Sequence, residues 1–404
     1  MTRRALFPAG ALALLTALPV VVTAGPTSAA TVAGTGFTKT VVYVDTLVGP
    51  DGATPCTVVG NLYRPNGVDA AHPAPAVLTT NGFGGSKDSA GYKSNDTAAQ
   101  FFARQGYVAL SYSGLGFGGS DCNIQLDDPD WDGKAGSQLI SFLGGCRRGS
   151  TAKHAAKTVH VDYVQKDAVD HAGVRRSDDP RVGMIGLSYG GAVQFSVAKV
   201  DKRLDTIIPQ ITWNDLSYAL APNDTSFRTD PVSKKQTVTY ATPGTEKFEW
   251  VSEFFALGFA EVANHPDSVR PASTCPGFDS RACQAKVQMD AQGYPDAATL
   301  AFSRHASVAS FLSGVTIPTF LSQGQGDTLF NLQESVATYR GLKARGVPVK
   351  LAWQQWGHST DAAAPGELDF AKAPGDTLLG TRYLAWMDRY LRGRATSTGP
   401  EFEY

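Results

Sequence analysis

The 404-residue chain has almost no net charge and no basic run. Its 36 Lys and Arg residues are balanced by 37 Asp and Glu residues, which gives a formal net charge of −1. Proteins that bind nucleic acid present a basic face to the phosphates, so this charge balance argues against nucleic acid as a partner. The sequence also lacks internal repeats and a low-complexity linker. It therefore predicts one large domain with an insertion, or two smaller domains.

Cysteine is scarce, with five residues, and none stands at zinc-site spacing with histidines. We therefore expect neither a metal nor a cofactor. The cysteines fit an oxidising compartment. Cys275 and Cys283 are close in sequence, and Cys122 and Cys146 bracket one loop-rich segment. We expect these two disulfides and a free Cys56, although sequence alone does not fix the connectivity.

Long apolar runs are absent except at the N-terminus. Arg3-Arg4 precedes an apolar run over residues 5–22 and then small residues up to Ala30. This pattern predicts a secretory signal peptide over residues 1–30, and Thr2-Arg3-Arg4 suggests the twin-arginine type. The sequence thus predicts a secreted protein without a membrane span in the mature chain.

Two further motifs are incomplete. The glycine-rich stretch 114–120 lacks the Lys-Ser/Thr of a phosphate-binding loop and the spacing of a dinucleotide site, so it predicts no nucleotide cofactor. Residues 127–132 hold four aspartates but lack full EF-hand spacing. We favour a solvated loop there, with a calcium site as the alternative.

The chain does contain Gly186-Leu187-Ser188-Tyr189-Gly190-Gly191, preceded by an apolar strand-like run and followed by a helix-like run. A serine in a G-x-S-x-G turn between a strand and a helix is typical of a nucleophile elbow. The strained turn exposes the hydroxyl, and side chains in place of Gly186 and Gly190 would collide with nearby backbone.

Strand-like and helix-like runs alternate along most of the chain, which predicts an α/β fold with a mainly parallel central sheet flanked by helices. The expected strands are 40–45, 57–63, 76–80, 107–112, 181–185, 204–211, 317–322 and 349–353. The expected helices are 98–105, 161–174, 192–199, 331–345 and one over 379–391.

The alternation stops between residues 214 and 310, where we expect no strand of the same kind. Thr245 is a plausible N-cap for a helix with an aromatic stripe that includes Phe254 and Phe255. The stripe either packs on the main domain or lines an acyl or side-chain pocket. We predict a mostly helical cap over 214–310, inserted between core segments 31–213 and 311–404.

A serine nucleophile needs a base and an orienting acid, in the chain order Ser, Asp/Glu, His. Only His358 lies on a loop after a late strand. Asp327 follows the strand before it, whereas the rivals Asp361 and Glu367 come after the histidine. The order predicts Ser188, Asp327 and His358 as a catalytic triad.

The oxyanion requires two donors. The amide of Tyr189 is the first, because it follows the nucleophile. The second is expected in the loop after the strand 76–80, from the Phe83 amide, with Gly82 the next choice. The alternative is an ordinary glycine turn.

On the elbow, the segments 106–120 and 318–327, and Trp356-Gly357-His358, the chain resembles the Xaa-Pro dipeptidyl-peptidase and cocaine-esterase-like acyl-hydrolase family of α/β hydrolases. The resemblance covers about residues 41–393. It implies the α/β-hydrolase fold, the triad above, a helical cap and hydrolysis of esters or amides. Some members place a tyrosine hydroxyl in the oxyanion hole, where this chain has Asn81-Gly82-Phe83.

Together these observations predict a secreted serine hydrolase that acts on small ester or peptide substrates through an acyl-enzyme. We favour carboxylic esters. One alternative is a peptidase of the Xaa-Pro dipeptidyl type, for which we find no carboxylate to hold a free N-terminal amine. The other is a catalytically silent α/β-hydrolase used as a binding module.

Overall fold

The computed structural model describes residues 32–34, 36–222, 224–229, 231–242, 244–360 and 362–404. The expected signal peptide lies outside these residues, as does Asp361. No helix in the described part of the chain combines the length and apolar character needed to cross a bilayer.

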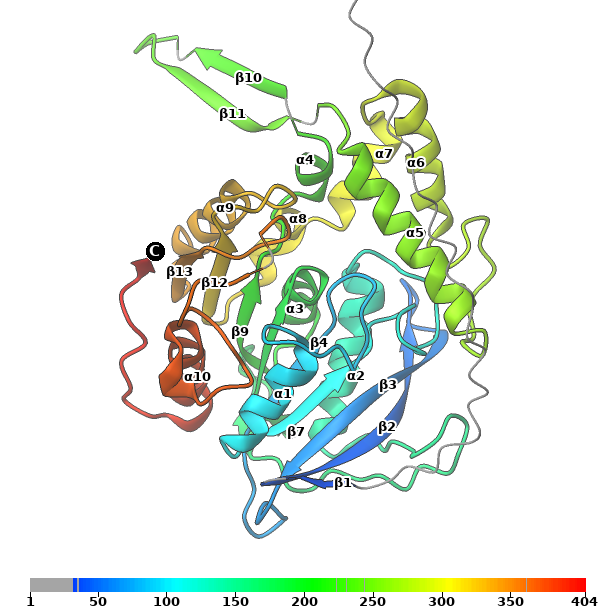
Figure 1. Ribbon diagram of the computed structural model, residues 1–404, viewed down its shortest axis with the longest axis vertical. Helices are drawn as coiled ribbons and strands as arrows, with labels where there is room; N and C mark the ends of the chain where they lie inside the picture. Colours follow the sequence, from blue (N-terminus) through cyan, green and yellow to red (C-terminus); the bar gives the residue numbers. More distant parts are fainter. Residues whose placement is uncertain (1–31, 35, 223, 230, 243, 361) are drawn as a thin grey trace, which may run out of the picture.

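A central sheet of ten strands runs through the described chain in the order β1-β2-β3-β5-β4-β8-β9-β12-β13-β14 (Figure 1). Strands β1, β2, β3 and β5 pair antiparallel. From β5 onward every neighbouring pair is parallel, which confirms the predicted mainly parallel sheet. The strands are β1 (Val32–Gly34), β2 (Phe37–Val48), β3 (Thr54–Pro65), β4 (Ala76–Thr80), β5 (Val108–Tyr112), β8 (Val182–Leu187), β9 (Leu204–Gln210), β12 (Thr319–Gly324), β13 (Val349–Gln354) and β14 (Phe402–Glu403).

Helices cover both faces of this sheet, because its parallel strands are apolar on both sides. On β8, Met184 belongs to the core under α2 (Lys134–Leu143), α3 (Tyr189–Val200) and α9 (Leu332–Lys343). The next residue, Ile185, belongs to the opposite core under α1 (Asn95–Arg104) and α10 (Leu378–Arg392). The alternation of side chains along a strand thus places the sheet between two apolar layers.

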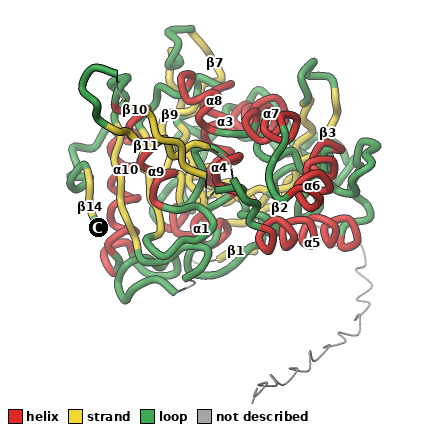
Figure 2. Tube along the Cα trace, turned by 90° about the horizontal axis from the view of Figure 1, so that it is seen from above, coloured by secondary structure: helices red, strands yellow, loops and turns green. Residues whose placement is uncertain are grey.

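The chain between β9 and β12 contains most of the remaining helices. These elements are α4 (Leu216–Leu220), β10 (Asp224–Thr229), β11 (Gln236–Thr242), α5 (Phe248–Asn264), α6 (Ser280–Gln292), α7 (Ala297–His305) and α8 (Val308–Phe311). Figures 1 and 2 both place α5, α6 and α7 side by side at one end of the molecule. We call residues 214–310 the inserted segment.

The inserted segment, where we expected no strand of the same kind as those of the sheet, contains a separate antiparallel hairpin of β10 and β11 that does not join the central sheet. The sequence of β11 is rich in β-branched and aromatic residues, which favour strands. Lys234, in the connecting turn, has a positive φ of 58°.

The helix expected over residues 161–174 is wrong. The chain there forms a two-stranded hairpin of β6 (Lys166–Val169) and β7 (Arg175–Pro180). Asp170 Oδ1 accepts hydrogen bonds from the Ala172 and Val174 amides, and Gly173 has a φ of 79°. This turn chemistry outweighs the helical periodicity. The helix of this region is α2, which lies in the segment between Cys122 and Cys146 that was expected to be loop-rich.

The disulfides differ in part from the expectation. Cys275 pairs with Cys283 as predicted, but Cys122 pairs with Cys56, and Cys146 is a free, exposed thiol. The predicted Cys122–Cys146 bond and free Cys56 are therefore wrong.

The loop after β5 explains the pairing of Cys56 with Cys122. This loop runs back along β3, where the Asp121 amide donates to the Thr57 carbonyl at 2.9 Å. The Thr57 amide donates in turn to Asp121 Oδ2 at 3.1 Å. The two cysteine Cα atoms consequently lie 5.7 Å apart, within disulfide reach, although 66 positions separate them.

The aspartate run is largely buried, so the favoured solvated loop is wrong. Asp127 is 1% exposed, and Asp128 and Asp132 are also buried. The Asp127 amide donates to the Tyr189 hydroxyl at 3.1 Å, and its carbonyl accepts from the Ser196 hydroxyl. Hydrogen bonds from the main chain of Asp127 to α3 therefore hold this stretch in the interior.

Candidate active site

Ser188 lies in a strained turn between β8 and α3. Its φ of 57° and ψ of −119° are unfavourable for a residue with a side chain. A Cβ at Gly186 would lie 2.6 Å from the Gly190 carbonyl oxygen, and one at Gly190 would lie 2.5 Å from that of Thr80. Only glycine fits at these two positions, for the steric reason expected from the sequence.

Ser188, His358 and Asp327 form a continuous hydrogen-bonded chain. His358 Nε2 lies 2.8 Å from Ser188 Oγ, and His358 Nδ1 lies 2.7 Å from Asp327 Oδ2. The Asp327 side chain is fully shielded from solvent. Its Oδ1 accepts the Leu329 and Phe330 amides, each at 2.9 Å. The three residues thus have the geometry of a serine nucleophile, a base and an orienting carboxylate, and their catalytic roles remain a prediction.

The imidazole of His358 is flanked by two aromatic rings. Phe330, next to the Asp327 loop, lies 5.2 Å away between ring centroids, and Trp250 of α5 lies 6.2 Å away. The rival carboxylate of Glu367 instead accepts the Gln355 amide at 2.6 Å. Asp327 is therefore the described carboxylate that contacts the imidazole.

The two amides predicted as oxyanion donors have no acceptor. In the described chain, neither the Phe83 amide nor the Tyr189 amide donates a hydrogen bond to another protein group. Gly82 lies against the nucleophile, since a Cβ there would be 3.8 Å from the Ser188 Cβ. Unpaired donors beside a nucleophile are what an oxyanion hole requires, and the assignment of these three residues remains a prediction.

Asn81 holds the Phe83 loop in place. Its Oδ1 accepts the Gly114 amide at 2.9 Å, and its Nδ2 donates to the Gly82 carbonyl at 2.8 Å. Asn81 is fully buried. Sequence reasoning recognised the loop but not this support, since a polar residue before a glycine turn has no distinctive pattern.

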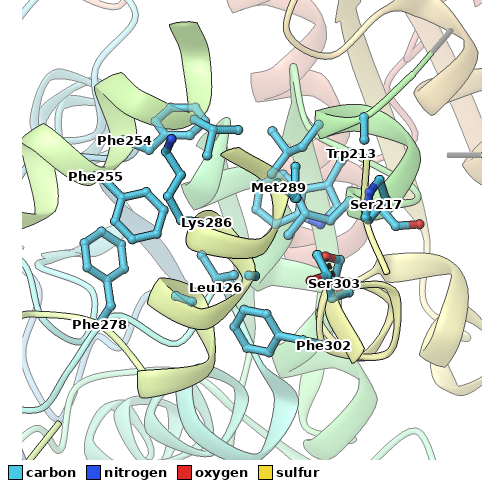
Figure 3. Close-up of a pocket in the computed structure, with 18 of the residues that line it drawn as sticks. Leu126, Trp213, Ser217, Phe254, Phe255, Phe278, Lys286, Met289, Phe302 and Ser303 are labelled. Carbon is cyan, nitrogen blue, oxygen red and sulfur yellow. Dashed lines mark hydrogen bonds between the residues drawn. The ribbon is translucent and has the colours of Figure 1, made fainter. Parts of the chain in front are cut away.

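A cavity opens at Ser188 and runs beneath the inserted segment. Its empty volume is about 880 Å³ including the mouth. Figure 3 shows Phe254, Phe255 and Phe278 on one side and Trp213 on the other. The lining is almost wholly apolar, and it includes residues of the core and of the inserted segment. The lining residues are Phe83, Leu126, Ser188, Tyr189, Trp213, Leu216, Ser217, Leu220, Ala221, Val251, Phe254, Phe255, Phe278, Ala282, Ala285, Lys286, Met289, Pro295, Thr299, Phe302, Ser303 and Phe330.

Comparison with known proteins agrees with this geometry. The family model described as X-Pro dipeptidyl-peptidase (S15 family) matches residues 51–360. The chain belongs to the S15 family. Membership places it among the serine hydrolases with the α/β-hydrolase fold. No curated protein matches the chain.

Solved structures show the same fold at low identity. A CocE/NonD family hydrolase from Staphylococcus aureus is 14% identical, with a TM-score of 0.53, over 90% of this chain and 53% of that one. An aminopeptidase from a marine sediment archaeon, Thaumarchaeota archaeon, is 14% identical, with a TM-score of 0.51, over 90% of this chain and 57% of that one. The present chain, a member of the S15 family, thus spans little more than half the length of either of these two proteins.

Lys247 and Glu334 tie the inserted segment to the region of Asp327. Lys247 Nζ, just before α5, donates to the Thr328 and Leu329 carbonyls at 2.7 and 2.6 Å, and burial lowers the pKa of this ammonium. Glu334 Oε2 accepts the amides of residues 214 and 215 at 2.7 and 3.1 Å. Neither residue belongs to a sequence motif, which is why sequence reasoning missed both.

One cluster of possible metal ligands occurs among the described residues. Asp128, Asp130 and His305 each bring a ligand atom within 4.8 Å of the others. Asp128 Oδ2 already lies 2.9 Å from His305 Nε2, and Asp130 Oδ1 lies 3.0 Å from Lys134 Nζ. Because both carboxylates already have nitrogen partners, we assign no metal to this cluster.

Proposed function

We propose that the chain is a secreted serine hydrolase that cleaves carboxylic esters through an acyl-enzyme on Ser188. The observation that carries the proposal is the unbroken hydrogen-bonded chain from Ser188 through His358 to Asp327, at the mouth of an apolar cavity. The inserted segment acts as a cap over this site. The two disulfides are compatible with export.

The geometry supports a two-step reaction. His358 Nε2 accepts the proton of Ser188 Oγ as this oxygen attacks the ester carbonyl, and Asp327 stabilises the resulting imidazolium. The Phe83 and Tyr189 amides donate to the oxyanion. His358 then gives its proton to the leaving alcohol oxygen. In the second step it takes a proton from water as the water oxygen attacks the acyl-enzyme, and it then returns this proton to Ser188 Oγ as the acid leaves.

The cavity favours esters over dipeptides. A dipeptidyl-peptidase must hold a free N-terminal amine, which calls for a carboxylate close to the nucleophile. None of the described residues that line the cavity has a carboxylate, and the charged group among them is the Lys286 ammonium. Peptide hydrolysis is the close rival, since the family model is named for it.

Active-site labelling tests the proposal. We expect a fluorophosphonate to label the wild type at Ser188, with turnover of short p-nitrophenyl esters exceeding that of Ala-Pro-p-nitroanilide. Ser188→Ala should abolish labelling and lower kcat by at least about 10⁴-fold. Ser303→Ala, at another serine of the cavity, is the matched control and should still be labelled.

Each outcome separates two candidates. Faster turnover of the anilide than of the esters would favour the peptidase. An unlabelled but folded wild-type protein would overturn the enzyme proposal and favour the silent binding module.

A further inference from the structure

We propose that the cavity beneath the inserted segment binds the acyl half of the ester and selects apolar carboxylic acids. This inference rests on the proposed function. It adds which half of the substrate enters the cavity and the chemistry that this half must have.

The position of the proposed base indicates which half of the ester enters the cavity. In ester cleavage His358 gives its proton to the leaving oxygen, so the alcohol must lie on the imidazole side of Ser188. Among the described residues, His358 itself and Trp250 do not line the cavity, whereas Phe83 and Tyr189 do. Phe330, whose ring also flanks the imidazole, belongs to the lining and marks its edge on the His358 side. The cavity therefore lies on the oxyanion side of the nucleophile, where the acyl group extends.

The hydroxyls of the lining are already hydrogen bonded within the protein. Ser217 Oγ donates to Asp215 Oδ1 at 2.6 Å, and Ser303 Oγ donates to the Thr299 carbonyl at 2.8 Å. Because these hydroxyls have already donated their protons, a carboxylate on the acyl chain would lose its water there and gain no donor from them in exchange.

The one charged group of the described lining is also neutralised. Lys286 Nζ forms an ion pair with Asp290, one turn along α6, and lies 4.6 Å from the centre of the Phe248 ring. Its side chain is 14% exposed. The ammonium is therefore not free to pair with an anionic substrate, and its methylene stem adds to the apolar surface.

A chain-length series measures this binding. Each methylene that the cavity removes from water contributes about 0.8 kcal/mol, which is about a four-fold gain in kcat/KM. We expect kcat/KM to rise from p-nitrophenyl acetate through butanoate and hexanoate to octanoate.

Two alanine-to-leucine substitutions on α6 test whether this helix forms part of the wall of the acyl-binding cavity. Ala285 lines the cavity, whereas Ala291 is exposed and lies outside the described lining. Ala285→Leu should lower kcat/KM for octanoate by about fifteen-fold and leave that for acetate within about two-fold, because the added side chain occupies the space of about two methylenes. Ala291→Leu should leave both unchanged.

Fluorophosphonate labelling of the same samples separates this inference from the proposed function. A labelled enzyme with a flat chain-length profile, or one in which Ala285→Leu slows acetate and octanoate equally, would overturn the acyl assignment while leaving the serine hydrolase intact. A folded wild type without labelling would overturn both.

Discussion

At the scale of single residues, Asp327 organises two loops at once. One oxygen accepts the Leu329 and Phe330 amides and fixes its own loop, while the other contacts His358 Nδ1 and fixes the imidazole. Because the carboxylate is wholly buried, its orientation depends on these contacts rather than on water. The position of His358 is therefore set by the Asp327 loop.

Asp327→Asn tests this role. The amide would keep the shape but hold the imidazole in the wrong tautomer, so we expect kcat for p-nitrophenyl butanoate to fall by about 10⁴-fold. Glu367→Gln changes a carboxylate that contacts the Gln355 amide instead, and it should leave kcat unchanged. A loss below about ten-fold in Asp327→Asn would contradict the assignment.

At the scale of elements, α9 anchors the start of the inserted segment through Glu334. This carboxyl is 2% exposed and accepts the amides of Asn214 and Asp215. Burial raises the pKa of Glu334 from 4.5 to about 7, because the ionised form has lost its water. The contact between core and insertion is therefore sensitive to pH.

The sign of this effect follows from proton linkage. Between pH 4.5 and about 7 the folded protein keeps a proton on Glu334 that the unfolded chain has released, so the contribution of Glu334 to stability falls as the pH rises. The slope is at most about 1.4 kcal/mol per pH unit. In Glu334→Gln, the free energy of unfolding measured in urea should change less with pH between pH 5 and 7 than in the wild type. Equal slopes of unfolding free energy against pH in Glu334→Gln and the wild type would contradict this prediction. Glu253→Gln, at an exposed residue of α5, is the control.

Elements with a strong local pattern were predictable. The strand 76–80 has the predicted bounds in β4, and the elbow is flanked by β8 and α3 as expected. The segment 161–174 has helical periodicity, but the turn at Asp170 and Gly173 decides its structure. The failure shows that periodicity without a capping signal is weak evidence for a helix.

At the scale of the whole molecule, the two disulfides constrain very different lengths of chain. Cys56–Cys122 joins β3 to a loop 66 positions away, whereas Cys275–Cys283 spans 8 positions. A longer closed loop removes more conformational entropy from the unfolded chain. The first bond should therefore stabilise the fold more.

The double variant Cys56→Ala/Cys122→Ala should lower the free energy of unfolding by about 4 kcal/mol, and Cys275→Ala/Cys283→Ala by about 2.5 kcal/mol. Guanidinium unfolding of the two variants beside the wild type measures both losses. Cys146→Ala, at the free thiol, is the control. A larger loss from the shorter loop would contradict the entropic argument.

The sequence by itself determined the α/β class, the elbow and the order of Ser188, Asp327 and His358. Each of these depends on residues that are close in the chain, such as a glycine turn between a strand and a helix, or a polar residue just after a strand. Parallel strands bring their carboxyl ends to one edge, so the chain order alone was enough to anticipate that these three residues meet.

Only the tertiary structure decided the Cys56–Cys122 bond, the burial of Asp127 and the apolar cavity. The cavity collects side chains from Phe83 to Phe330, and the disulfide depends on a loop returning along β3. Contacts of this kind form between segments far apart in sequence, and no local pattern encodes which segments meet. The substrate selection that we propose for the cavity therefore depends on the whole fold and not on any single segment.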